Sequence, residues 1–146
     1  MQKIDKKIFR VLDANFNRTR EGLRVCEDIL RFVFNSKTLA TEFKIIRHKV
    51  SSCLVQLNIN LFKFLEQRDT LRDVGRKSFS IELKRKNIAD IFFANIQRAK
   101  ESIRVLEEFS KLINKKAAVN FKALRYKIYK LEKEAIKRFL TLSHLR

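Results

Sequence analysis

The chain has 146 residues, a formal net charge of +18 at pH 7, no Pro, no Trp and two Gly. This length suits one domain with a hydrophobic core, and Cys26 and Cys53 form no CxxC pair and make no disulfide framework. No apolar run is long enough to cross a membrane and no apolar leader stands at the N-terminus, so we expect a cytoplasmic protein without a membrane segment.

The spacing of apolar residues predicts long helices, because a chain without Pro has few places to break a helix. The stretch over residues 67–86 loses this period and contains Gly75, which indicates a loop. We expect one helical domain over residues 1–146. In chain order, the four predicted helices cover residues 4–34, 38–66, 86–113 and 118–140.

One polar pattern occurs twice in the chain. ANFNRTREGLRVCED begins at Ala14, and ANIQRAKESIRVLEE begins eighty residues later at Ala94. A second pair, FKIIRHKV and FKALRYKI, follows at an offset of 78 residues, so the repeat covers about 8–66 and 88–140. Two hairpins that are each apolar on one side must bury those sides together. We therefore predict an all-α fold, a long-helix four-helix bundle made of two duplicated helical hairpins with a central loop.

Polar residues of this pattern fall on the apolar face of their helices. On a helical wheel, Asn15 and Arg18 share a face with the apolar residues of the first helix, and Asn95 and Arg98 do so in the third. An amide or a charge that faces a core is costly unless it is paired. Four amide and guanidinium groups that converge from two hairpins suit a phosphate, for which Arg offers a planar fork of donors.

Two interpretations of these groups stay open. In one, an internal network pairs the two arginines with Glu21 and Glu101 and holds the hairpins in register. In the other, the groups line a pocket whose ligand supplies the missing partners, and the small residues Gly22 and Ser102 leave room for that ligand. The same wheel places Arg24, Glu27, Arg104 and Glu107 on the outer side, where ion pairs three residues apart contribute a few tenths of a kcal/mol.

The central loop carries a second cluster of charged residues, which spans Arg68–Arg76. Carboxylates at Asp69 and Asp73 above a basic pocket are ligands that suit Mg²⁺. The alternative is a solvated turn, in which Asp73 supports the chain before Gly75. The sequence contains no GxxxxGK[ST] phosphate loop and no HExxH zinc motif, which argues against those two kinds of site.

Four segments in this order resemble one known family: LDANFNRTREGLRVCEDILRF, RDTLRDVG, ANIQRAKESIRVLEEFSKL and ALRYKIYKLEK. Together they resemble the helical domain found fused before thiamine-phosphate synthase in bacteria, which is similar to a monofunctional hydroxymethylpyrimidine phosphate kinase. The resemblance implies ATP-dependent phosphorylation of 4-amino-5-hydroxymethyl-2-methylpyrimidine phosphate to the diphosphate. It also implies the phosphorylated pyrimidine and ATP as small-molecule partners, with a thiamine-phosphate synthase as a further candidate. A second copy of the chain is a separate candidate partner, which the resemblance does not imply.

Under this hypothesis phosphoryl transfer needs positioning and cancellation of negative charge, which paired Arg and Asn groups supply. The central loop would close over the nucleotide, and Mg²⁺ would be held by two loop carboxylates. The predicted catalytic residues are Arg18, Arg98, Asp69 and Asp73, the last two also as Mg²⁺ ligands. The predicted binding residues are Asn15, Glu21, Arg24, Arg68, Asn95, Glu101 and Arg104.

Two other functions compete with the kinase. A non-enzymatic basic bundle would bind nucleic acid or another polyanion with an affinity that falls as salt is added. This function leaves the polar residues of the inner faces unexplained, and the lysines are dispersed along the chain. A structural, dimerising helical module is the third candidate, because exposed Phe on long amphipathic helices favours association.

Overall fold

The computed structural model describes residues 5–78 and 80–143, and within them the chain is all-α, as predicted, with no strand. A π-helical turn, η1 (Ile29–Val33), continues the first helix, and a 3-10 turn, η2 (Ser80–Leu83), lies in the central loop. The predicted helix start at Ile4 lies outside the described residues. The α-helices are α1 (Lys6–Asp28), α2 (Lys37–Gln56), α3 (Leu61–Gln67), α4 (Ile88–Ser110) and α5 (Lys115–Ser143).

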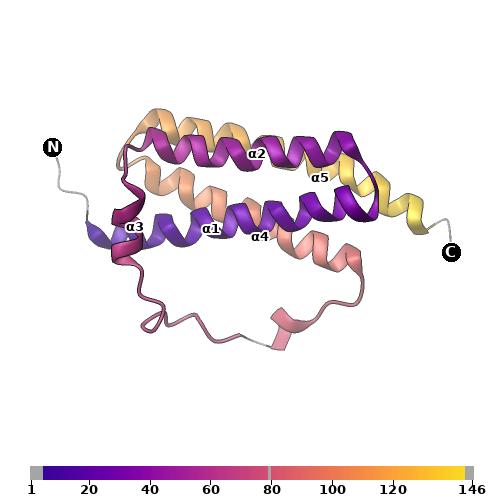
Figure 1. The fold of residues 1–146 in the computed structure, drawn as a ribbon, viewed down its shortest axis with the longest axis horizontal. Coiled ribbons are helices and arrows are strands. Elements are labelled where there is room, and N and C mark those ends of the chain that lie inside the picture. Colours follow the sequence, from indigo (N-terminus) through magenta and orange to yellow (C-terminus); the bar gives the residue numbers. More distant parts are fainter. Residues whose placement is uncertain (1–4, 79, 144–146) are drawn as a thin grey trace.

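The four long helices pack side by side as two hairpins. The first hairpin is α1 with α2 and the second is α4 with α5, and across the hairpins α1 contacts α4 while α2 contacts α5. The short helix α3 packs against α1 near its N-terminal end, and the central loop passes beside α1 and α4 on the side away from α2 and α5 (Figure 1). None of the described helices is both long and apolar enough to cross a membrane.

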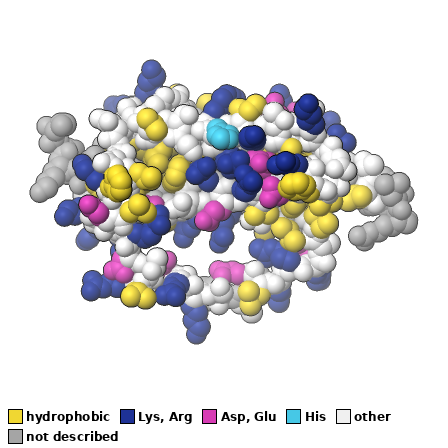
Figure 2. Space-filling model, in the orientation of Figure 1, with side chains coloured by type: hydrophobic (Ala, Val, Ile, Leu, Met, Phe, Trp, Pro, Cys, Tyr) yellow, Lys and Arg dark blue, Asp and Glu magenta, His cyan; other side chains and the backbone are white. Residues whose placement is uncertain are grey.

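Four phenylalanines of the hydrophobic core are fully buried. Phe43, Phe64, Phe92 and Phe121 are all 0% exposed. The rings of Phe43 and Phe92 meet edge to face with centroids 6.2 Å apart, so an α2 residue packs directly on an α4 residue. Lys and Arg side chains are spread over the visible surface without forming a single patch (Figure 2).

The predicted second helix is wrong at its C-terminal end, because the helix breaks before Leu61. α2 ends at Gln56, and Asn58 has a φ of 54°, a left-handed conformation that Asn adopts more readily than most residues. Asn60 then caps α3, since its Oδ1 accepts a hydrogen bond from the Phe62 backbone N at 3.0 Å. The break turns α3 across α1 and sends the chain into the central loop.

The close approach of α1 and α4 depends on small residues. A Cβ at Gly22 would lie 2.7 Å from the backbone oxygen of Asn95. One turn away, the Oγ1 of Thr19 and the Oγ of Ser102 are 2.6 Å apart in a buried hydrogen bond. The expectation that Gly22 leaves room for a ligand is therefore wrong, because the backbone of α4 occupies that space.

We expect Gly22→Ala to lower the free energy of unfolding by about 1–3 kcal/mol, the range for overpacking a core. Helix propensity alone would give the opposite sign, because Ala stabilises a helix interior by about 1 kcal/mol relative to Gly. The control is Gly75→Ala, whose Cβ would meet its nearest atom at 3.6 Å. Denaturant unfolding measures both variants, and an unfolding midpoint for Gly22→Ala at or above that of the parent would contradict the packing argument.

Candidate functional site

A polar cavity of about 660 Å³ lies between α1, α4 and the central loop. We call it the central cavity. It contains five of the predicted site residues, from both copies of the repeated pattern. Its lining residues are Asn15 and Arg18 of α1, Ser78, Glu82, Leu83 and Arg85 of the loop, and Ala94, Asn95, Gln97, Arg98, Glu101, Ser102 and Val105 of α4.

The two asparagines are held in matching ways by their own helices. The Nδ2 of Asn15 donates to the Val11 carbonyl oxygen at 2.8 Å, and the Nδ2 of Asn95 donates to the Ile91 carbonyl oxygen at 2.8 Å. Asn15 is 6% exposed, and its Oδ1 also accepts a hydrogen bond from Nη1 of Arg18 at 3.4 Å. With their amide nitrogens engaged by the backbone, both side chains have fixed directions and keep an acceptor oxygen for other partners.

Arg18 and Arg98 lie at the open side of the central cavity. Both side chains are exposed, so the expectation that they sit within the apolar face is wrong, although both line the same cavity. Within the described ranges, neither Arg18 nor Arg98 forms an ion pair with Glu21 or Glu101. The internal ion-pair network considered from the sequence is therefore not present among these residues. Two cationic groups thus face the cavity from opposite hairpins.

The central loop adds a third guanidinium that the sequence analysis missed. Arg85 lines the cavity just before α4, and its Nη1 donates to the Lys84 carbonyl oxygen at 2.8 Å. Glu82 of η2 brings a carboxylate to the same wall. Loop residues have no periodicity, so the one available signal was the basic run from Lys84 to Lys86 directly before the Asn87 cap.

Arg68 anchors the loop instead of lining the cavity. Its Nε donates to Oδ2 of Asp13 at 2.8 Å and its Nη2 to Oδ1 of Asp13 at 2.7 Å, a two-pronged pair. Asp13 is a buried residue of α1. The hydrogen bond with the Asp13 carboxylate raises the pKa of Arg68 above its usual value. This pair ties the start of the loop to the helix that carries Asn15 and Arg18.

The two predicted Mg²⁺ ligands form turns within the loop. Oδ1 of Asp69 accepts from the Arg72 backbone N at 3.1 Å, and Oδ1 of Asp73 accepts from the Gly75 backbone N at 3.0 Å. Neither residue lines the central cavity, whose carboxylates are Glu82 and Glu101. In the described part of the chain no group of three or more His, Cys, Asp or Glu side chains is arranged to hold a metal ion.

A second cavity of about 370 Å³ lies between α4 and α5, and we call it the side cavity. It shares Gln97 and Glu101 with the central cavity, and the Nε2 of Gln97 donates to Oε1 of Glu101 at 2.9 Å. The two cavities therefore adjoin across this hydrogen-bonded pair. The side cavity is lined by Gln97, Lys100, Glu101, Arg104, Arg125 and Tyr129.

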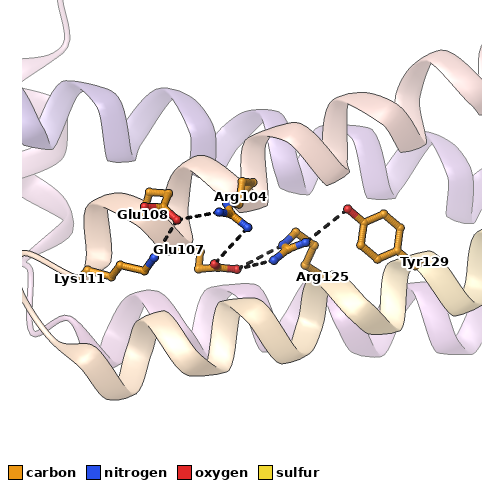
Figure 3. Close-up of polar contacts among 6 residues, drawn as sticks. All are labelled: Arg104, Glu107, Glu108, Lys111, Arg125 and Tyr129. Carbon is orange, nitrogen blue, oxygen red and sulfur yellow. Dashed lines mark hydrogen bonds and ion pairs between the residues drawn. The ribbon is translucent and has the colours of Figure 1, made fainter.

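Glu27 and Glu107 were expected on a solvated face, and this expectation is wrong. They are 3% and 4% exposed, because α2 covers the first and α5 the second. Nε of Arg47 lies 3.1 Å from Oε1 of Glu27, and Nη2 of Arg125 lies 3.1 Å from Oε1 of Glu107. Figure 3 shows the second pair, and Nη1 of Arg104 lies 3.7 Å from Oε2, the other carboxylate oxygen of the same glutamate. Each hairpin thus contains a buried Glu–Arg ion pair between its two helices.

Besides Arg68, two further predicted binding residues lie outside both cavities. Glu21 is exposed on α1, and Arg24 makes ion pairs along its own helix, with its Nε 3.4 Å from Oδ1 of Asp28. Arg104, at the matching position of α4, pairs through Nη2 with Oε1 of Glu108 at 3.1 Å and also lines the side cavity. The polar groups that meet at cavities thus come mainly from the second copy of the pattern.

The described residues define an all-α protein with a cationic cavity between two helical hairpins. The chain belongs to the ThiD2 family, whose model matches residues 10–134. This match confirms the resemblance found in the four sequence segments.

Several relatives carry the name thiamine-phosphate synthase. The one from Nostoc sp. PCC 7120 is 38% identical over 132 residues, which are 90% of this chain and 36% of the relative. The one from Synechocystis sp. PCC 6803 is 37% identical over 86% of this chain and 35% of the relative. The one from Rhodopirellula baltica is 32% identical over 85% of this chain and 33% of the relative. The chain thus spans about a third of the length of these relatives, and no solved structure matches it.

Proposed function

We propose that the chain is a kinase of thiamine biosynthesis, which transfers the terminal phosphoryl group of ATP to 4-amino-5-hydroxymethyl-2-methylpyrimidine phosphate. An oxygen of the substrate phosphate forms the new P–O bond, the bond to the ADP leaving group breaks, and the products are the pyrimidine diphosphate and ADP. The observation that carries the proposal is the meeting of Arg18, Arg85 and Arg98 at one cavity. Membership of the ThiD2 family, together with relatives named thiamine-phosphate synthase, supports a role in thiamine biosynthesis.

The cavity residues suit the electrostatic demands of this reaction. Both substrates carry phosphates, and phosphoryl transfer is accelerated chiefly by positioning and by cancelling negative charge. Arg18 and Arg98 present guanidinium forks from opposite hairpins, and a fork of this kind binds phosphate oxygens in pairs. Asn15 and Asn95, fixed by their backbone bonds, would orient the pyrimidine amine or a phosphate.

Mg²⁺ is part of the proposal, and the residues of the central cavity fit it. Mg²⁺ takes oxygen ligands and is commonly bound by one or two carboxylates together with substrate phosphates. Glu82 and Glu101 line the cavity and are the carboxylates that would hold it there, in place of the turn-forming Asp69 and Asp73. When bound, the ion would neutralise part of the phosphate charge.

Ligand-dependent stability tests the proposal against a polyanion-binding function. At about 100 times its dissociation constant a ligand of the folded state adds about 2.7 kcal/mol. For a chain of this size that free energy raises the melting temperature by about 5–10 °C. We expect this shift with ATP plus Mg²⁺ and with the pyrimidine monophosphate, as measured by differential scanning fluorimetry.

The matching activity assay separates the outcomes. Incubation of the pyrimidine monophosphate with ATP and Mg²⁺ should give the diphosphate and ADP, resolved by ³¹P NMR. If the only stabilising ligands are short oligonucleotides, with a shift that vanishes as salt rises, the chain binds polyanions and the kinase proposal is overturned. Stabilisation by both small molecules without product formation would overturn it as well.

A further inference from the structure

The two hairpins differ in aromatic residues at matched positions. The buried Glu–Arg ion pair is kept in both, but the second hairpin has Tyr126 and Tyr129 where the first has His48 and Ser51, 78 residues earlier. These are the two tyrosines of the chain. The Ser-to-Tyr difference falls at a residue that lines the side cavity. The side cavity therefore has an aromatic ring in its lining, whereas the matching position of the first hairpin has none.

The ring of Tyr129 is both exposed and held in place. It is 42% exposed, and its hydroxyl accepts a hydrogen bond from Nη1 of Arg125 at 3.4 Å. Arg125 is itself fixed by the buried carboxylate of Glu107, as Figure 3 shows. The ring of Tyr126 meets it edge to face at 5.9 Å. A positioned aromatic ring with an open surface is a stacking partner for a nucleobase, since every base has a flat π-face.

Two cationic side chains of α4 lie beside this ring in the side cavity. Nζ of Lys100 lies 5.6 Å from the centroid of the Tyr129 ring and 2.8 Å from Oε2 of Glu132, and Arg104 lines the same cavity. The side cavity adjoins the central cavity at Gln97 and Glu101. A nucleotide that lies across these two residues would have its base in one cavity and its phosphates among the arginines of the other.

We propose that the side cavity binds the nucleobase of the nucleoside triphosphate donor and that Tyr129 stacks on this base. The inference rests on the proposed kinase function. It assigns the donor to the second hairpin and leaves the remainder of the central cavity to the phosphorylated pyrimidine.

The test replaces Tyr129 with the residue that the first hairpin has at this position. Tyr129→Ser should raise the dissociation constant and the KM for ATP by about tenfold, since one stacked base contributes a factor of this order. The KM for the pyrimidine phosphate should stay within twofold, and Tyr129→Phe should restore ATP binding because it keeps the ring. Ser51→Ala is the matched control and should leave all of these values unchanged. Calorimetric titration with Mg-ATP gives the dissociation constants, and circular dichroism checks that each variant is folded.

Inorganic tripolyphosphate distinguishes a base site from a phosphate site. It lacks a base, so Tyr129→Ser should bind it as tightly as the parent protein does. Equal loss of affinity for tripolyphosphate and ATP would overturn the base assignment, as would unchanged ATP binding in Tyr129→Ser.

Because the chain has no Trp, tyrosine emission in a Tyr126→Phe background reports on Tyr129 directly, and ATP should quench it. If ATP quenches the emission but the protein makes no diphosphate, the kinase proposal is overturned and the base site is supported. If the protein makes the diphosphate and Tyr129→Ser binds ATP as the parent does, the base site is overturned and the kinase proposal is supported.

Discussion

Replacing Arg18 or Arg98 with Ala should lower kcat/KM for the pyrimidine phosphate by about 10²–10³-fold, the usual loss when one fixed donor to a developing charge is removed. Both side chains are exposed at the rim of the central cavity and belong to no ion pair in the described ranges, so the fold should be unaffected. Steady-state kinetics of diphosphate formation measure the loss, and thermal unfolding shows whether each variant keeps the melting temperature of the parent.

Two further variants sharpen this result. Arg→Lys at either position keeps the charge and loses the planar fork, so its activity should fall between those of the parent and the Ala variant. Arg31→Ala removes an exposed arginine of η1, outside both cavities, and should leave kcat/KM unchanged. Parent-like activity of both Ala variants, or a loss equal to that of Arg31→Ala, would show that the two cavity arginines do not act on the substrate.

Breaking a buried ion pair should have the largest effect on stability. Arg47→Met removes the closer partner of the Glu27 carboxylate, whose side chain is 4% exposed, and leaves it only the longer contact with Nη1 of Arg24 at 3.8 Å. Removal of one member of a buried pair costs about 3–5 kcal/mol, a large part of the 5–15 kcal/mol that stabilises a typical domain. Urea unfolding should show this loss.

The double variant Glu27→Leu with Arg47→Met is the control. It removes both charges and fills the space with apolar side chains, so it should recover most of the lost stability. A double variant as unstable as Arg47→Met would mean that shape, not the unpaired charge, dominates. The same pair of experiments at Glu107 and Arg125 should give a similar result, because the second pair is equally buried.

Periodicity was sufficient to predict the four long helices and the positions of the two cavity asparagines. It places a residue on one face of its own helix, and Asn15 and Asn95 do lie on faces that meet between α1 and α4. It says nothing about a neighbouring helix that covers the opposite face, so Glu27 and Glu107 were wrongly expected in solvent. The break at Asn58 was missed because a single left-handed residue interrupts a helix without changing its apolar period.

The loop side of the site was beyond this method. Ser78, Glu82 and Arg85 reach the cavity because the chain turns back along α1 and α4, a path that depends on anchors distant in sequence. One such anchor joins Arg68 to Asp13, 55 residues earlier in the chain. Asp69 and Asp73 were expected to hold Mg²⁺ because they were placed above a basic pocket, and in the structure their side chains support backbone turns.

The contact between the hairpins at Gly22 and Ser102 has a consequence for behaviour in salt. It consists of a tight backbone approach and a hydroxyl pair, with no formal charge at either point. Dissolved ions shorten the range of charge–charge forces to about 8 Å at physiological strength and leave such uncharged contacts almost untouched. Added salt should therefore weaken the binding of an anionic ligand in the central cavity. The distance between α1 and α4, which form two walls of this cavity, should stay the same.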